Sequence, residues 1–254
     1  MLLRSVTQHV KDQNWFAVGI DFLIVVVGVF VGIQVSNWNE ARLFNQTEIK
    51  LFQELKREVA GSYATNEKWV ENYTHVHDAG KRSLDVLSSA EDCKGDCWRT
   101  LVGFMDSSQH QTLRVQRTIY DRMRSLGLPR SEKVFNALEA YMAQANATLQ
   151  SFDSKPDYRI IVRELIPLEE QQYYWTECYF NRDGLEHYKP SCTNDAPDEE
   201  MAEVVAAIKG HPTIKAKLTR WTAEIAVLIQ VIITLNEAAE SVIKAIEEEL
   251  PNEH

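Results

Sequence analysis

Residues 19–40 read GIDFLIVVVGVFVGIQVSNWNE, and this stretch decides which kind of fold the chain can adopt. Its uninterrupted apolar run, Phe22 to Ile33, is twelve residues long, a length that also suits a buried helix of a globular protein. The flanks favour a membrane span, because Trp15 and Trp38 lie 23 positions apart, roughly 35 Å along a helix. We therefore expect a transmembrane helix over residues 16–38, with Trp15 and Trp38 as its interfacial anchors.

The energetics of insertion support a membrane span despite the acid at its start. Ten large apolar side chains in the run contribute on the order of −3 to −6 kcal/mol to insertion. An acid at the bilayer centre costs about 2.5 to 3.5 kcal/mol, and Asp21 lies nearer an end of the span. No small-residue cleavage site follows the run, so we expect an uncleaved anchor with a short cytoplasmic tail, residues 1–15.

Asp21 shares one face of this helix with three small or polar residues. At about 100° per residue, Gly28, Gly32 and Asn39 fall within about 20° of Asp21. Small residues let a second helix approach closely, and a polar group in lipid is best tolerated when it meets a partner. The alternative is an acid that reaches the headgroups alone, beside glycines that are frequent in membrane helices anyway. We favour an association face for a membrane protein partner or a second copy.

The charge balance excludes one class of partner. The chain has 254 residues, with 27 basic against 37 acidic side chains and a net charge of −10. Nucleic-acid binding needs a concentrated basic surface, and none is visible in the sequence. We therefore expect a helical domain over residues 39–254 that has no nucleic-acid partner.

The cysteines indicate on which side of the membrane the bulk of the chain lies. The basic residues do not, because equal numbers of them flank the span on either side. All four, Cys93, Cys97, Cys178 and Cys192, follow the apolar run, and an even set on one side favours disulfides in an oxidising compartment. The local pairing closes loops of about 5 and 15 residues, worth roughly 2 and 3 kcal/mol, and we prefer it over the two other connectivities. Zinc ligation is the weaker alternative, because C-x-x-C knuckles are missing. We expect the bulk of the chain to be periplasmic.

The region after the span shows mainly helical periodicity. Gly61 and Gly80 are positions where the first helix could bend or break. Ser131 is the expected N-cap of a later helix. The expected segments are helix 39–87, a polar loop over 88–110, helix 111–126, helix 132–152, and an irregular or hairpin-bearing excursion over 153–197 tied down by the second cysteine pair.

The end of the chain carries the most regular pattern. Apolar residues alternate at spacings of four and three without a miss between Pro212 and Pro251, which bound a helix of roughly 36 residues, about 54 Å long. These seam positions are Ile214, Leu218, Trp221, Ile225, Leu228, Ile232, Leu235, Ala239, Val242 and Ile246. The pattern predicts antiparallel packing against residues 40–87; a homo-oligomeric coiled coil is the alternative. The expected fold is mainly α: a transmembrane helix continuing into an antiparallel bundle with long coiled-coil-like helices.

No catalytic, cofactor or metal motif appears in the sequence, so we expect a non-enzymatic protein without a cofactor or metal. His75 and His77 point about 200° apart on a helix, and we interpret both as surface histidines. The aromatic cluster at residues 173–180 either packs as a satellite core or lines a ligand surface. The residues of that surface would be Tyr173, Tyr174, Trp175 and Tyr179.

Three sequence elements resemble a family of bacterial single-span inner-membrane proteins. They are Gln34 to Glu40 (Q-x-x-N-W-N-E), Thr118 to Gly127 (TIYDRMRSLG), and His211-Pro212 before the long terminal helix. The resemblance implies an inner-membrane protein with an extracytoplasmic helical domain, and it brings no activity and no catalytic residue. The excursion over 153–197 does not belong to the resemblance.

Two functional hypotheses follow from the sequence. The first is a membrane-anchored periplasmic protein that acts by association, as a subunit or accessory partner of a membrane complex, through the Asp21 face and the helical domain. The second is an extracytoplasmic ligand-binding sensor that uses the aromatic cluster. Because a tail of about fifteen residues is too small for an output domain, such a sensor would signal through a partner.

Overall fold

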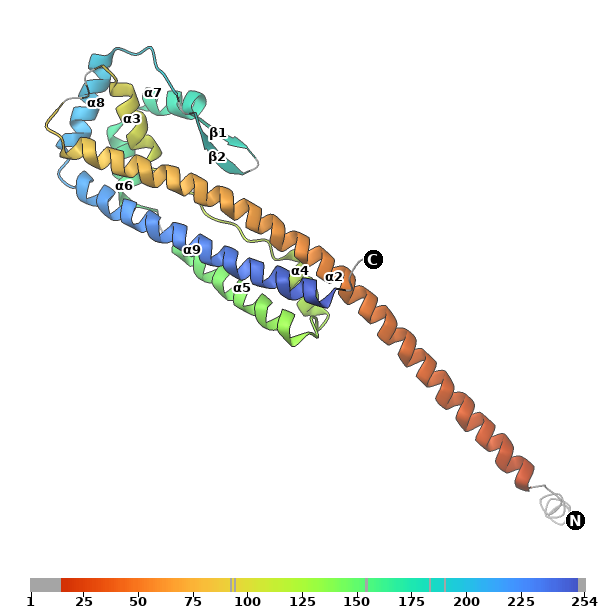
Figure 1. Ribbon diagram of the computed structural model, residues 1–254. Coiled ribbons are helices and arrows are strands. Elements are labelled where there is room, and N and C mark those ends of the chain that lie inside the picture. The colour runs from red at the N-terminus through yellow and green to blue at the C-terminus, as the bar shows by residue number, and fades with distance from the viewer. Residues whose placement is uncertain are drawn as a thin grey trace, which may run out of the picture. The chain divides into compact units, whose positions relative to one another are not determined.

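The computed structural model is mainly helical, which confirms the expected class (Figure 1). The chain divides into two compact units, residues 1–53 and 54–254, and each is described by itself. The described residues are 15–91, 93, 95–153, 155–182, 184–189 and 191–250.

Helix α2 (Trp15–Ser88) is a single helix of 74 residues, and its apolar stretch is exposed on all sides. Phe22 is 69% exposed and Phe30 is 61% exposed, and no part of the most apolar stretch is buried. By length and composition this helix can cross a membrane, and so can α9 (Ile214–Glu249), whose apolar stretch is partly buried. The two helices therefore differ in what surrounds their apolar side chains.

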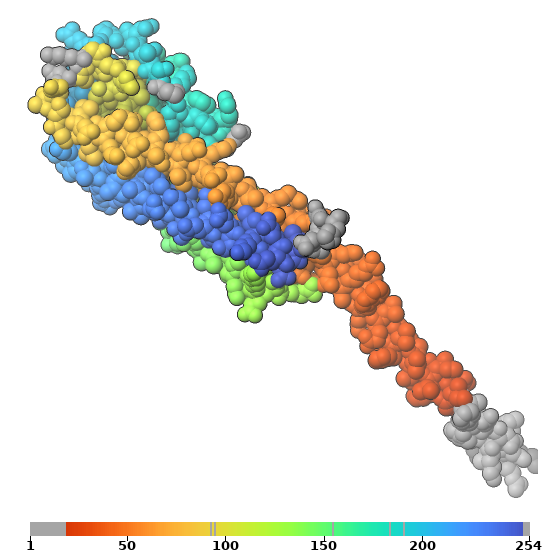
Figure 2. Space-filling view, in the orientation of Figure 1, coloured from red at the N-terminus to blue at the C-terminus, as the bar shows by residue number. Residues whose placement is uncertain are grey.

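Helix α9 lies between Pro212 and Pro251, as predicted. All ten seam positions are buried, each at 5% exposure or less. Lys56 of α2 pairs with Glu247 at 2.8 Å, and Asn66 donates to Asn236 at 2.9 Å. Numbers rise along α2 as they fall along α9, so the two helices run in opposite directions where they touch. Figure 2 shows α9 beside residues 54–88 of α2. Packing of coiled-coil type stays a prediction.

Helix α5 (Glu132–Ser151) packs against α9, and its start lies beside the end of α9, where Lys133 pairs with Glu248. The hydroxyl of Ser131 accepts a hydrogen bond from the N–H of Val134, as expected of an N-cap, and also donates to Glu249 at 2.6 Å. The core of the 54–254 unit therefore lies where α2, α5 and α9 face one another.

Two expectations between α2 and α5 are wrong. The predicted loop over 88–110 contains helix α3 (Cys97–Asp106), which Asp96 caps and which buries Leu101 and Phe104. The predicted helix over 111–126 is only α4 (Thr118–Ser125), because Tyr73 binds the backbone of Gln111 and the segment that follows is not helical.

The excursion over 153–197 is more regular than expected. Its hairpin pairs Tyr179 with Tyr188 and Arg182 with Leu185. Two short helices that the sequence did not indicate, of nine and six residues, precede the hairpin. The elements are α6 (Asp157–Leu165), α7 (Leu168–Tyr173), the π-helix η1 (Tyr174–Cys178), β1 (Tyr179–Arg182), β2 (Leu185–Tyr188) and, after the excursion, α8 (Asp198–Gly210).

The α2 helix continues through Gly61 and Gly80, the two positions where the sequence allowed a bend or a break. A Cβ at Gly80 would lie 2.5 Å from Oγ1 and 3.2 Å from Cγ2 of Thr222, so rotation of the threonine cannot relieve both contacts. A Cβ at Gly61 would meet nothing within 4 Å. Gly80 therefore allows α2 and α9 to approach closely.

Gly80→Ala is expected to lower the free energy of unfolding by about 1–2 kcal/mol. Overpacking costs about 1–3 kcal/mol, and the higher helix propensity of alanine offsets about 0.5–1 kcal/mol of that cost. The matched variant Gly61→Ala is expected to raise it by about 0.5–1 kcal/mol, because only propensity changes. Urea unfolding followed by circular dichroism measures both values. Stabilisation by Gly80→Ala would contradict the close approach to Thr222.

Candidate functional site

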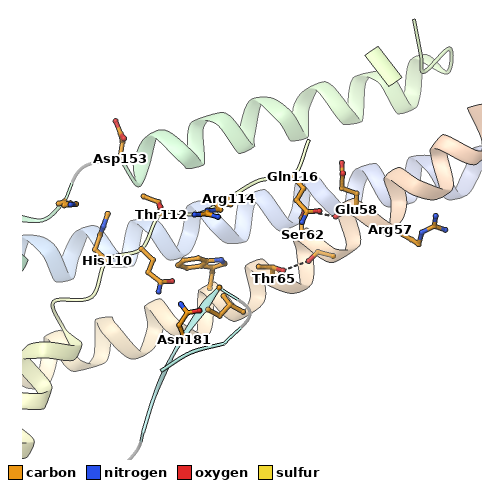
Figure 3. A pocket seen from close by; sticks show the side chains of 16 residues that line it. Arg57, Glu58, Ser62, Thr65, His110, Thr112, Arg114, Gln116, Asp153 and Asn181 are labelled. Carbon is orange, nitrogen blue, oxygen red and sulfur yellow. Dashed lines mark hydrogen bonds between the residues drawn. The ribbon is translucent and has the colours of Figure 1, made fainter. Parts of the chain in front are cut away.

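A groove lies within the 54–254 unit, with a volume of about 840 Å³ (Figure 3). One wall is a stripe of α2, where Arg57, Gly61, Thr65 and Trp69 recur every four residues. The other walls are the segment His110–Gln116, the turn after α5, and the tip of the hairpin. The groove is thus assembled from four parts of the chain that are distant in sequence.

The groove is lined by three cations and two acids. Its cations are Arg57, Arg114 and Lys155, and within the described ranges none of the three has a carboxylate oxygen within 4.0 Å. Of its two carboxylates, Glu58 is engaged by α4, whose Ile119 N–H donates to both oxygens at 3.2 and 3.3 Å. Burial raises the pKa of Glu58, while these backbone hydrogen bonds lower it. Asp153 is the second acid of the lining.

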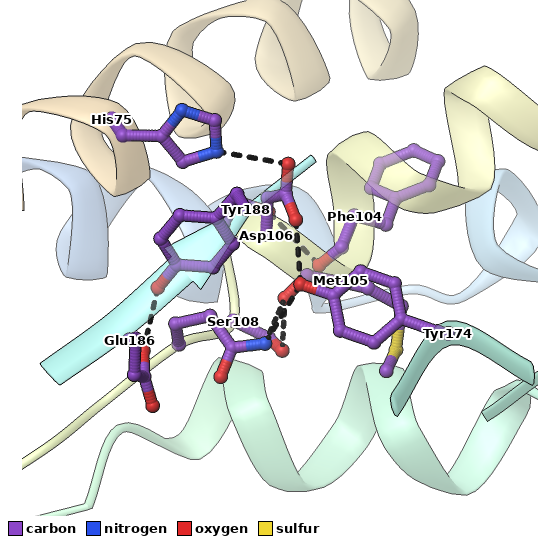
Figure 4. Close-up of polar contacts among 10 residues, drawn as sticks. His75, Phe104, Met105, Asp106, Ser108, Tyr174, Glu186 and Tyr188 are labelled. Atoms are coloured by element: carbon purple, nitrogen blue, oxygen red, sulfur yellow. Dashed lines mark hydrogen bonds and ion pairs between the residues drawn. The ribbon is translucent and has the colours of Figure 1, made fainter. Parts of the chain in front are cut away.

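A second polar site surrounds Asp106, at the end of α3 (Figure 4). The Asp106 carboxylate accepts from the Tyr174 hydroxyl at 2.6 Å, and its other oxygen lies 3.0 Å from Nε2 of His75. The His75 ring stacks on Tyr188, with 4.4 Å between ring centroids. Burial, and then the Asp106 charge, raise the pKa of Tyr174. Asp106 thus joins α3 to α2 and η1, and His75 extends the contact to the hairpin.

A second carboxylate in this site is buried inside the hairpin. Glu186 is 7% exposed and accepts from the hydroxyls of Tyr179 at 3.2 Å and Tyr188 at 2.5 Å. Burial raises the pKa of Glu186, and the tyrosine hydrogen bonds and the charges of Arg159 and Arg163 oppose that shift. Hydroxyl donors on the oxygens offset the cost of burying a charge.

Arg159 and Arg163 complete this network from α6. Arg159 donates to the carbonyl of Ser108 at 2.8 Å, and Arg163 donates to Oε1 of Gln109 at 3.2 Å. The guanidinium of Arg163 stacks on Trp175, 4.8 Å from the ring centroid. The guanidinium groups of both arginines therefore donate to partners inside the network. A balanced network of this kind fixes the relative positions of its elements.

The structure changes the interpretation of the predicted aromatic and histidine residues. Tyr174 is fully buried, so it cannot form part of a ligand surface, and it is the satellite-core alternative that the structure favours here. Trp175 packs on Arg163, and the hydroxyl of Tyr173 donates to the carbonyl of Thr193 at 2.7 Å. His75, expected to be a surface residue, contacts Asp106 through its ring nitrogen. These side chains hold the excursion against α2 and α3.

The predicted membrane face lies on α2 in the first unit. Asp21, Gly28, Gly32 and Asn39 are exposed, and a Cβ on either glycine would meet nothing within 4 Å. Their association with another helix stays a prediction. Trp38 is 67% exposed, whereas Trp15 is the first residue of α2 and its side chain lies outside the described part.

All four cysteines are bonded in the local pairing, with Cα–Cα distances of 4.9 Å for Cys93–Cys97 and 5.2 Å for Cys178–Cys192. These bonds consume the thiols that the zinc alternative requires. The carboxylate of Asp198 accepts from the N–H groups of Gly95 and Cys97, at 2.9 and 2.8 Å. Asp198 thereby fastens the first disulfide loop to the start of α8.

One wall of the groove carries a local sequence signal, and its period is that of a strand rather than of the predicted helix over 111–126. Leu113 is buried and Val115 is half-buried, while Thr112, Arg114 and Gln116 between and beside them are exposed. This alternation is the period of a strand rather than of a helix. It was the one available indication that residues 111–117 are extended.

Comparison with known proteins adds no assignment to this geometry. No protein-family model, no curated protein and no solved structure matches the chain.

Proposed function

We propose that this protein is a membrane-anchored helical protein that acts by association, as a subunit or accessory partner of a membrane complex. The single observation that carries the proposal is the exposure of the apolar stretch of α2. Ile24, Val25 and Val29 are 62%, 63% and 58% exposed, on a helix long and apolar enough to cross a bilayer.

The cost of leaving such a stretch in water supports the membrane as its surroundings. Contiguous apolar patches on soluble monomers rarely exceed a few hundred Å² (roughly 300–600 Å² at most), and a larger one marks contact with a membrane or a protein. This stretch exposes apolar side chains from Ile20 to Val35 around the helix. A lipid environment satisfies every face of it at once, which a single docked protein surface would not.

The two disulfides support an oxidising location for the 54–254 unit. Structural disulfides are rare in reducing compartments and common in the periplasm. Cys97 and Cys178 are 0% and 2% exposed, as expected of bonds that serve stability. The proposal therefore places the N-terminus in the cytoplasm and the bulk of the chain in the periplasm of a bacterial inner membrane.

The association face supplies the link to a partner. Asp21 lies in line with Gly28, Gly32 and Asn39 on exposed helix, where close approach by another helix would shield the carboxylate from lipid. The ligand-sensor alternative loses its main support, because Tyr174, at the centre of the aromatic cluster, is fully buried.

The test is cross-linking in native membranes, followed by purification in detergent and identification of bound chains. The triple variant Asp21→Leu, Gly28→Leu, Gly32→Leu is expected to lose most of the cross-linked product. The control triple Val26→Leu, Val27→Leu, Phe30→Leu changes the opposite face and is expected to retain it. Equal cross-linking by both triples would overturn association through this face, and recovery of the chain in the soluble fraction would overturn the membrane anchor.

A further inference from the structure

The segment between α3 and α4 is stretched along α2. Its start is fixed where Tyr73 binds the backbone of Gln111, and its end where Glu58 accepts from the N–H of Ile119. These α2 residues are fifteen positions apart, about 22 Å along the helix. Eight residues cover that distance at about 2.8 Å each, which is close to the strand rise of about 3.3 Å and far from the 1.5 Å of a helix.

The side chains of this segment alternate as in a half-buried strand. Leu113 is 3% exposed and faces the core, whereas Thr112, Arg114 and Gln116 are exposed and line the groove. Figure 3 shows these three polar residues in succession along the segment. The segment therefore has strand geometry without belonging to the sheet, whose strands are β1 and β2.

Most of the backbone of this segment has no hydrogen-bond partner among the described residues. The N–H and C=O of Gln111 both bond to the Tyr73 hydroxyl, at 3.1 and 2.8 Å. From Thr112 to Gln116, no backbone N–H or C=O bonds to another residue of the described part. Thr112, Arg114 and Gln116 are exposed, whereas Leu113 is buried and is not accessible to a partner. An unpaired extended edge is a template on which another strand can form.

We propose that the groove binds an extended, acidic peptide segment of a partner protein, which adds as a strand to the edge at Thr112–Gln116. Main-chain hydrogen bonds supply affinity in strand addition, and side-chain contacts supply specificity. The α2 wall runs from Arg57 to Trp69, about 18 Å, which holds about five extended residues. The cations Arg57, Arg114 and Lys155 select acidic side chains.

This inference deepens the proposed function, because it takes a protein as the occupant and names the recognised segment. It does not depend on the membrane face. Binding to the groove involves the 54–254 unit alone, whereas helix association involves Asp21, Gly28 and Gly32. The two proposals can therefore fail separately.

The test uses a fluorescein-labelled peptide, Glu-Val-Glu-Val-Glu, and fluorescence polarisation with the full chain in detergent. We expect saturable binding below 1 mM. N-methylation of two alternate peptide nitrogens is expected to weaken binding at least about tenfold, because it removes main-chain donors. The basic analogue Lys-Val-Lys-Val-Lys is expected not to bind. Absence of saturation by the acidic peptide up to 1 mM, or equal affinity after N-methylation at either register, overturns strand addition.

Variants locate the binding on the protein. Arg114→Gln with Lys155→Gln is expected to weaken binding of the acidic peptide about tenfold or more, since charge-assisted hydrogen bonds are lost. The control, Lys81→Gln with Arg82→Gln, removes the same net charge from exposed α2 positions that do not line the groove, and should change affinity less than twofold. Circular dichroism spectra verify the folding of both variants. Equal affinity of the two double variants would overturn the assignment to the groove, even if cross-linking through the membrane face succeeded.

Discussion

Ile232→Ala is expected to lower the free energy of unfolding of the 54–254 unit by about 3 kcal/mol, within the range of about 2–5 kcal/mol for truncating buried large aliphatic residues. Ile232 is a seam residue of α9 and is 0% exposed. The variant removes buried apolar contact and leaves a cavity that rigid neighbouring helices cannot close. Urea denaturation of the full chain in detergent, followed by circular dichroism and tryptophan fluorescence, measures the loss.

The matched control is Val227→Ala on the same helix. Val227 is 61% exposed, so its truncation is expected to change stability by no more than about 0.5 kcal/mol. By length and composition α9 could also cross a membrane. The comparison of the two variants tests whether α9 is instead a core helix with one buried face. A core helix responds strongly at one face only. Similar losses at positions 227 and 232 would contradict burial of a single seam.

The parts of the fold that the sequence predicted well are those set by local signals. The ends of α9 follow from two prolines, and the start of α5 follows from the Ser131 cap. The ten seam positions follow from uninterrupted periodicity over the whole of α9. The local disulfide pairing joins cysteines that are close in the sequence, so it could be predicted without knowing the tertiary contacts.

The elements that were missed depend on partners far away in the chain. Helix α3 follows Cys93 and Gly95 and begins at Cys97, and its buried end is fixed by Tyr158, whose hydroxyl donates to the carbonyl of Phe104 at 3.2 Å. The segment after it is extended because Tyr73 binds Gln111 from 38 positions away. No window of eleven to eighteen residues contains either contact, so local periodicity gave the wrong assignment for both.

The candidate groove could not be predicted from sequence for the same reason. Its cations Arg57, Arg114 and Lys155 come from three segments that only the fold brings together. Burial alone distinguishes Tyr174 from Trp175, although they are adjacent in one aromatic run. The sequence indicated which residues were chemically capable of recognition, and the packing determined which of them face solvent.

Removing the Cys178–Cys192 disulfide is expected to have the second large effect on stability. Cys178→Ala with Cys192→Ala should lower the free energy of unfolding by about 3 kcal/mol, because the bond closes a loop of about 15 residues in the unfolded chain. That loop contains the whole hairpin, including Glu186 and Tyr188. Urea unfolding of the oxidised wild type and of the variant measures the difference.

Cys93→Ala with Cys97→Ala is the matched control, and its expected loss is about 2 kcal/mol, because its loop is only about 5 residues. The order of the two losses matters, since the longer bond also holds the strands that carry Glu186 and both tyrosines around it. Without that bond, hairpin opening would expose a buried carboxylate to water and thereby favour the opened form. Equal or reversed losses would show that the hairpin is held by the Asp106 and Glu186 networks rather than by its bridge.

The two disulfides also give a test of location. In intact cells that express wild type, maleimide labelling only after reduction would place both bonds in an oxidising compartment. Immediate labelling of all four thiols would contradict the periplasmic location.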